Sequence, residues 1–459
     1  MQRTLLVVAN REQFPEPAFP LGALYVAAAV EAAGARARVF DAGLHRRPLT
    51  ALRAELAAFR PDVVGLSLRN ADNAAWPCTR TYVEWYAKVA AVVRAAAPRT
   101  RIVAGGPAYS IFARELRRVL LTRDGVVGDG EAAARLLGEG RLPGGVVDLP
   151  LEDLASISLP RRIAAAFPGA HRYRTAGVQT ARGCPHRCIY CTYPRLEGAR
   201  LRPRPAEAVA DEFERLRREL GVGEVFVVDS SFNASEDHLL EVCDELSRRR
   251  SRPGSPLAGM RFSCYLEPRV SDPAVFGLLA AAGCTSVDFG IDSGAEAMLP
   301  ALGKSFSVHD VRAATLAARR AGLDICHSLL FGGPGETAET VAETVRLTDE
   351  LAPTAVVAMV GLRIYPGTAL AASAREAGLI GARDTLLAPR FYAAGAAPGD
   401  PSVAWLPHQV RAAAAGRRAW FLPGARDWSA AWGPRLLRRL GKPGPLWRNF
   451  PRPRWYRYI

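Results

Sequence analysis

Apolar runs and helical segments alternate along most of the chain, and this alternation limits the possible folds more than any other feature. In residues 1–150, runs such as "RTLLVVAN", "PDVVGLSLRN" and "TRIVAGGP" are separated by segments with helical spacing of apolar residues. Strands that alternate with helices predict a parallel sheet covered on both faces. We therefore expect an α/β protein whose residues 1–150 form a doubly wound, Rossmann-like domain.

A second series of the same kind follows a proline-containing linker at residues 151–174. Six strand–helix units, from "GVQTA" to "AVVAMVGL", predict a partial (β/α)6 barrel over residues 175–375. Residues 376–459 lose this rhythm and are rich in tryptophan and arginine, which predicts a small, mostly helical region on the substrate side. In both architectures, ligands bind beyond the carboxyl ends of the strands.

Length and charge narrow the class of protein. A chain of 459 residues needs two or three cores. No apolar run approaches the roughly 20 residues of a membrane-spanning helix, and the first run is predicted to be a strand and no signal peptide, so we expect a cytoplasmic protein without a membrane partner. The net charge of +15 comes mostly from arginines spread along helices, which favours solvated faces over binding of nucleic acid.

The segment "ARGCPHRCIYCTYP" carries three of the eight cysteines, Cys184, Cys188 and Cys191, in one short loop. A structural zinc site needs four ligands, and a disulfide is disfavoured in a reducing compartment. An iron–sulfur cluster is the better match, because three thiolates can hold three irons of a cubane. The fourth iron would then be open to a ligand.

This C-x3-C-x2-C spacing, with Tyr190 before the last cysteine, resembles the signature of the radical S-adenosylmethionine (SAM) superfamily. The resemblance implies a [4Fe-4S] cluster held by the three cysteines, with SAM on the open iron. Later segments also resemble that superfamily: "VVDSSFN", "DFGIDSG", "LGKS" and "FGGPGET". The first departs from the usual Gly-Gly-Glu form. The implied contacts to the cofactors are Tyr190, Asp229, Ser230, Asp292, Ser293, Lys304, Gly332, Gly333 and Pro334.

The first domain resembles the cobalamin-binding domain that precedes the barrel in one large subgroup. The resemblance implies cobalamin contacts by Pro20, Gly22, Asn70, Asp72, Asn73, Gly105, Gly106 and Glu131. The Asp-x-His-x-x-Gly motif, whose histidine binds cobalt in some cobalamin proteins, is absent. Arg69, in "SLRNADN", is a cation and a poor metal ligand, so beneath cobalt it would disfavour coordination and favour methyl transfer away from the metal.

The function that these resemblances imply is that of a cobalamin-dependent radical SAM methyltransferase. Its substrate would be a small molecule or a peptide of secondary metabolism, and its electron donor a flavodoxin or ferredoxin. In the usual scheme, a second SAM yields a 5′-deoxyadenosyl radical that activates the substrate carbon. A tryptophan-methylating branch acts on an sp2 carbon without hydrogen abstraction, and Arg69 and Glu267 keep that variant open. Glu267 could reach SAM or the open iron.

Three alternatives stay open. A cobalamin-dependent radical SAM cyclase or rearrangement enzyme would carry the same motifs. A tRNA methylthiotransferase uses a similar barrel, but it has a second cysteine triad in its first domain, where this chain has only Cys78. A cobalamin-binding sensor with a structural cluster would need no open iron.

Overall fold

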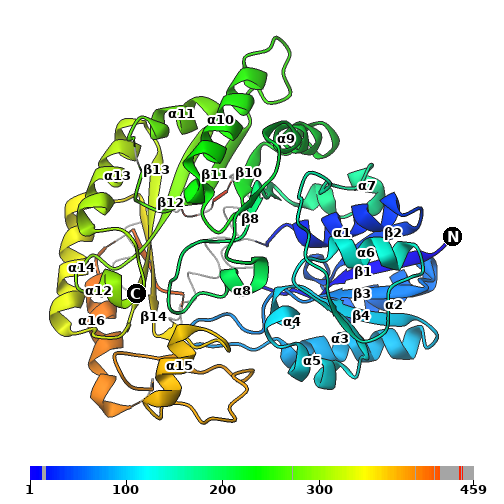
Figure 1. Ribbon diagram of the computed structural model, residues 1–459, viewed down its shortest axis with the longest axis horizontal. Coiled ribbons are helices and arrows are strands. Elements are labelled where there is room, and N and C mark those ends of the chain that lie inside the picture. Colours follow the sequence, from blue (N-terminus) through cyan, green and yellow to red (C-terminus); the bar gives the residue numbers. More distant parts are fainter. Residues whose placement is uncertain are drawn as a thin grey trace.

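The computed structural model describes residues 1–12, 17–270, 272–397, 400–417, 419–423, 444, 445 and 447. The structure has two parallel sheets (Figure 1). The first is formed by the N-terminal part of the chain, and the second is covered on its outer side by an arc of helices. The predicted fold class, a Rossmann-like domain followed by a radical SAM type of partial barrel, is confirmed. The arginine- and proline-rich tail beyond residue 447 lies outside the described residues.

The first sheet is built from short strands whose side chains are buried almost throughout, as in β1, where five of the six residues are buried. Its strand order is β2-β1-β3-β4-β5-β6, and every pair is parallel. The strands are β1 (Arg3–Val8), β2 (Arg36–Asp41), β3 (Val63–Ser67), β4 (Arg101–Gly105), β5 (Asp124–Val127) and β6 (Val146–Asp148). The helices are α1 (Leu21–Ala32), α2 (Pro48–Phe59), α3 (Val83–Ala96), α4 (Pro107–Ile111), α5 (Ala113–Leu120) and α6 (Glu131–Gly138).

The second sheet is a half-barrel whose strands follow the order of the chain. Its order is β17-β14-β13-β12-β11-β10-β7, again with parallel pairs only. The strands are β7 (Thr175–Val178), β10 (Glu224–Val227), β11 (Arg261–Leu266), β12 (Cys284–Asp292), β13 (Asp324–Phe331), β14 (Ala355–Val360) and β17 (Trp420–Phe421). The covering helices are α9 (Ala206–Leu220), α10 (Glu236–Arg250), α11 (Val275–Ala282), α13 (Val308–Arg320) and α14 (Ala338–Leu351).

Shorter elements connect these layers. They are α7 (Ile163–Ala166), α8 (Tyr193–Glu197), α12 (Met298–Ala301), α15 (Ala369–Glu376), α16 (Trp405–Ala414) and the antiparallel pairs β8 (Ala181–Arg182) with β9 (Arg202–Pro203) and β15 (Leu362–Arg363) with β16 (Phe391–Tyr392). The C-terminal region thus adds helix α16 and one unexpected strand, β17, at the edge of the half-barrel. No helix among the described residues is long and apolar enough to cross a membrane.

The two faces of the half-barrel differ in their exposure. Outward side chains pack on the helices: Phe262 on Phe213 of α9, Phe289 on Phe276 of α11, and His327 on Thr315 of α13. The side chains between them, which point inward because strand residues alternate, are in several cases partly exposed. The inner face therefore borders an accessible lumen, and the carboxyl ends of its strands lie near those of the first sheet.

Candidate active site

The cysteine loop starts directly after β8 and is held by backbone contacts. Gly183 has a φ of 97°, and a Cβ there would collide with the carbonyl of Arg200, so the turn requires glycine. The amide of Cys184 donates to Gly198, and that of Cys191 donates to the carbonyl of Cys188 at 3.1 Å. The sequence therefore folds this segment into a compact loop that keeps the three thiols together.

The three thiols suit a cluster better than a single ion. The charges of Cys184 and Cys188 both act on Cys191, so the three sulfurs share one environment. Among the described residues, no three His, Cys, Asp or Glu side chains converge to hold one metal ion. A cubane requires no such convergence, because each thiolate binds its own iron. Burial raises the pKa of Cys191 to about 11, and iron would stabilise the thiolate that burial disfavours.

A polar triad stands beside these cysteines. The hydroxyl of Tyr190 donates to Asp292, and the Lys304 ammonium pairs with the same carboxylate at 2.7 Å. Lys304 also donates to the carbonyl of Gly290 at 3.2 Å and lies over the Tyr190 ring. Asp292 has a φ of 61°, a conformation that costs energy for a residue with a side chain and is common at functional sites. The structure thus brings together three residues that are 114 positions apart at most in the chain.

Other predicted SAM contacts serve the protein itself. Asp229 is buried and accepts from the backbone amide of Thr180 at 2.7 Å, and burial raises its pKa to about 7. Ser230 donates to the carbonyl of Gly183 and so holds the cysteine loop. Ser293 exchanges a hydrogen bond with Thr344 of α14. These side chains position the loops around the site, whereas their contact with SAM stays a prediction.

The "FGGPGET" turn follows the end of β13. A Cβ on Gly332, whose φ is 101°, would lie 3.0 Å from a side-chain carbon of Leu406, and one on Gly333 would lie 2.7 Å from Leu302. The glycines therefore allow close packing of α16 and α12 onto this turn. Pro334, next in the turn, is partly buried.

Glu267, at the end of β11, faces the cysteine loop. Its Oε1 accepts from the Ser305 hydroxyl at 2.7 Å, and its Oε2 lies 3.4 Å from Nε2 of His186, which stands between two of the cysteines. Glu267, His186 and Lys304 line a cavity of ≈ 1010 Å³. The predicted reach of Glu267 to the cluster is thus compatible with its place in the fold.

The loop after β3, predicted to contact cobalamin, is held mostly by its own side chains. Asp72 accepts from Arg363 of β15 at 3.0 Å and from the amide of Ala74, so its buried side chain joins the two domains. The Asn73 side chain accepts from the amide of Arg80. The carbonyl of Asn70 accepts from a buried tyrosine. Asp72 and Asn73 therefore shape this loop, and the contact of the loop with cobalamin stays a prediction.

Of the remaining predicted cobalamin contacts, some have a structural role in the fold and others do not. Gly106 has a φ of 93°, and a Cβ there would lie 2.8 Å from the carbonyl of Leu68, so glycine lets two strand-end loops touch. Gly105, Pro20 and Gly22 lie at the ends of β4 and the start of α1, with open or ordinary surroundings. Glu131 is buried, and both its oxygens accept from Arg182, so its carboxylate joins the domains as well.

Arg69 is exposed just after the end of β3, and its charge acts on two tyrosines that the sequence did not single out, Tyr193 and Tyr265. Burial raises the pKa of both hydroxyls, and the charge of Arg69 opposes that rise. Tyr193 is two residues past the last cysteine, and Tyr265 is two before Glu267 on β11. Strand alternation puts Tyr265 and Glu267 on the same face, and this was the available signal.

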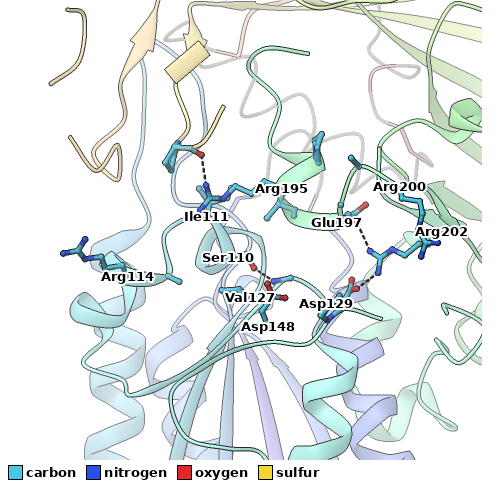
Figure 2. Close-up of a pocket in the computed structure, with 18 of the residues that line it drawn as sticks. Ser110, Ile111, Arg114, Val127, Asp129, Asp148, Arg195, Glu197, Arg200 and Arg202 are labelled. Atoms are coloured by element: carbon cyan, nitrogen blue, oxygen red, sulfur yellow. Dashed lines mark hydrogen bonds and ion pairs between the residues drawn. The ribbon is translucent and has the colours of Figure 1, made fainter. Parts of the chain in front are cut away.

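A second cavity, of ≈ 840 Å³, opens between the first sheet and α8 (Figure 2). It is bordered by the ends of β5 and β6 and by several guanidinium groups, including Arg114, Arg195 and Arg200. The charge of this lining is mixed, because six carboxylates share it with the guanidinium groups: Glu115, Asp129, Asp148, Glu152, Glu197 and Asp384. None of the predicted cobalamin contacts lines this cavity.

Comparisons with known proteins agree with this geometry. A sequence profile of the radical SAM superfamily matches residues 178–348, and one of the B12 binding domain matches residues 7–137. The tryptophan 2-C-methyltransferase of Streptomyces laurentii is 28% identical over 456 residues, covering 82% of this chain and 75% of that protein. OxsB, a cobalamin-dependent SAM radical enzyme, shares the fold at a TM-score of 0.65 and 15% identity.

The solved structures of TsrM from Kitasatospora setae superpose on nearly the whole chain. One contains tryptophan and aza-SAM, and the other contains cobalamin and a [4Fe-4S] cluster. The first has a TM-score of 0.83 at 25% identity and covers 98% of both chains. The two domain matches confirm the predicted cofactors: cobalamin, a [4Fe-4S] cluster and SAM. The chain belongs to the radical SAM superfamily, as a cobalamin-dependent methyltransferase near the tryptophan-methylating branch.

Proposed function

We propose that this enzyme transfers a methyl group to a ring carbon of tryptophan or of a closely related aromatic amino acid. The observation that carries the proposal is a pair of exposed tyrosines close to the cluster loop: Tyr193, two residues after Cys191, and Tyr265, near the end of β11. Aromatic walls suit an aromatic substrate. The similarity to a tryptophan 2-C-methyltransferase over 82% of the chain supports the same substrate class.

The chain's own residues have distinct tasks in this proposal. When bound, cobalamin supplies a transferable methyl group, and the cluster and SAM supply the methyl source and its activation. Cys184, Cys188 and Cys191 bind the cluster. Tyr190, Asp292 and Lys304 form a network of charge-assisted hydrogen bonds beside it, which can orient the polar end of SAM. Glu267 stands ready to contact SAM or the open iron.

Arg69 works by its charge and its inability to bind metal. A guanidinium keeps its proton at all physiological pH values and offers no lone pair. Near a bound cobalamin, Arg69 would supply positive charge and no ligand to the metal. A flavodoxin or ferredoxin is the donor class that would keep these cofactors reduced.

The test is anaerobic reconstitution with iron, sulfide and cobalamin, followed by incubation with SAM and tryptophan. We expect S-adenosylhomocysteine and a tryptophan heavier by one CH2, with no stoichiometric 5′-deoxyadenosine. Product of unchanged mass together with 5′-deoxyadenosine would support the cyclase or rearrangement alternative. If neither SAM-derived product forms in cluster-replete protein, the sensor alternative holds and the proposal falls.

A matched pair of variants tests the role of the arginine. Arg69→Ala should abolish methylation while the [4Fe-4S] and cobalamin contents stay near those of the parent protein. Arg174→Ala removes an exposed arginine before β7 and should leave the rate unchanged. Equal rates in both variants would remove Arg69 from the reaction.

A further inference from the structure

The lumen of the half-barrel contains an acidic group that no ion pair satisfies. Asp288 lies on the inner face of β12, between the outward residues Val287 and Phe289, and is partly exposed. Its Oδ1 accepts from the hydroxyl of Ser328 on β13 at 2.8 Å. Among the described residues, no lysine, arginine or histidine forms an ion pair with it. Burial raises its pKa to about 6, although hydrogen bonds from Ser328 and Cys326 lower it.

Aromatic side chains stand next to this carboxylate. Tyr265 pairs with Asp288 in the sheet register and is 40% exposed, although protein surrounds it on the inner face of β11. Its ring meets that of Phe226, on β10, edge to face at 4.9 Å. The negative charge of Asp288 contributes to the raised pKa of the Tyr265 hydroxyl, after burial, so the two groups are close. The exposure of Tyr265 therefore faces the lumen.

Two unsatisfied hydroxyls lie deeper in the same lumen. Ser263 and Ser286 are partners in the register between β11 and β12, two residues before Tyr265 and Asp288 respectively. Strand alternation points them inward as well. Both are at least 98% buried, and neither Oγ has a hydrogen-bond partner among the described residues. Buried polar atoms without a partner are rare in native proteins, and they suggest a ligand or water at this depth.

We propose that Asp288 binds the protonated amine of the substrate, so that the amino acid enters the lumen with its ammonium group toward the floor. A carboxylate in a low-dielectric wall without a counter-ion is costly, and a cationic ligand would remove that cost. The aromatic ring of the substrate then rests against Tyr265 and Tyr193. Asp292, at the carboxyl end of the strand that carries Asp288, lies above it. This inference rests on the proposed function, because it assigns the polar end of that substrate.

The amine is favoured over the indole N–H as the group that meets Asp288. A hydrogen bond to a charged partner contributes about twice as much as a neutral one. Asp288 is therefore a specificity-determining residue that selects aromatic amines.

The test is equilibrium dialysis of the cofactor-loaded enzyme with three labelled ligands: tryptophan, tryptamine and indole-3-propionate. The parent enzyme should bind the two amines at least roughly tenfold more tightly than the acid, which lacks an amine. Asp288→Asn should weaken both amines by roughly tenfold or more and leave the acid within about twofold. Asp288→Glu, which keeps the charge, should retain the preference for amines.

The control is Asp244→Asn, the same change on the exposed face of α10, which should alter none of the three affinities. The inference fails if the parent enzyme binds the acid as tightly as the amines, a result that needs no variant. It also fails if Asp288→Asn binds tryptophan normally, or loses all three ligands equally while its cobalamin content stays normal. If the parent enzyme binds neither amine and methylates no tryptophan, the proposed function fails instead.

Discussion

Replacing Arg182 by methionine should destabilise the protein strongly, because this guanidinium neutralises two buried carboxylates. Nη1 donates to Asp129 at 2.8 Å, and Nη1 and Nη2 donate to the two oxygens of Glu131 at 3.0 and 2.6 Å. The side chains of all three residues are at most 8% exposed. Methionine keeps much of the side-chain volume but removes the positive charge, so Asp129 retains only Arg202 as an ion-pair partner among the described residues and Glu131 loses its own. Removing one partner of such a buried pair costs about 3–5 kcal/mol.

Differential scanning fluorimetry measures the loss. At about 2–4 °C per kcal/mol for units of 150–250 residues, Tm should fall by roughly 6 to 20 °C. The control is Arg200→Met, which removes an exposed pair with Glu152 and should stay within about 0.5 kcal/mol of the parent protein. If Arg182→Met melts with the control, the network does not hold the domains together and the reasoning is refuted.

The pH dependence provides a second check. Burial alone would raise the pKa of Asp129. The hydrogen bond from Arg202 and the charge of Arg182 lower it by more, so the pKa of Asp129 lies below its usual value. A depressed carboxyl pKa gives stability that is present above the unfolded value, near 3.9, and is lost as the pH falls through the folded value. In Arg182→Met this contribution shrinks, so the gap in stability between the variant and the parent protein should narrow as the pH falls below about 4, and stay nearly constant above about pH 5.

Three further predictions concern separate parts of the chain. Cys191→Ser should leave the anaerobically reconstituted protein without a stable four-iron cluster, as iron and sulfide analysis would show. Gly106→Ala should cost more stability than Gly140→Ala in urea unfolding, because both positions have a positive φ but only Gly106 faces a backbone carbonyl. His327→Gln should reduce the loss of stability between pH 6.5 and pH 5 by about 2 kcal/mol, because burial lowers the pKa of His327 to about 3 and only the unfolded chain binds the proton there. The exposed His309→Gln is its control, and equal slopes for the two variants would contradict this account.

The fold could be predicted because it depends on local patterns. The expected strands, which became β1–β5 of the first sheet and β7 and β10–β14 of the second, alternate with helical spacing, and parallel topology follows from that alternation. The short edge strand β6 was not predicted, because its three residues have no such pattern. Strand β17 could not be predicted, because two residues, Trp420 and Phe421, pair with β14 only through contacts that no periodicity encodes. The cluster and SAM could be predicted because the cysteine spacing lies within one loop, whereas cobalamin was predicted from the resemblance of residues 1–150 to a cobalamin-binding domain.

The site residues that were predicted less well depend on distant partners. Asp72 stood in a loop where corrin amides were expected, yet its partner Arg363 comes from the far end of the barrel. Glu131 likewise meets Arg182, which is 51 residues away. Asp288 is part of the segment "DFGIDSG", which resembles a turn near SAM. Its lack of a counter-ion depends on the side chains that surround it in the folded barrel. Polar residues at strand ends were thus located correctly, whereas their partners required the structure.

These ion pairs between distant residues explain how the cluster loop of the barrel and the strand ends of the first domain can be held at a fixed separation. Arg182 is two residues before Cys184, the first cysteine of the cluster loop, and it is bound to the end of β5 through Asp129 and Glu131. A shift of the first domain would therefore pull directly on the strand that carries the cluster. Methyl transfer between groups on separate domains is sensitive to displacements of about 1 Å. Buried ion pairs are directional and costly to break, so at this junction they fix the separation of the two edges more firmly than apolar packing alone would.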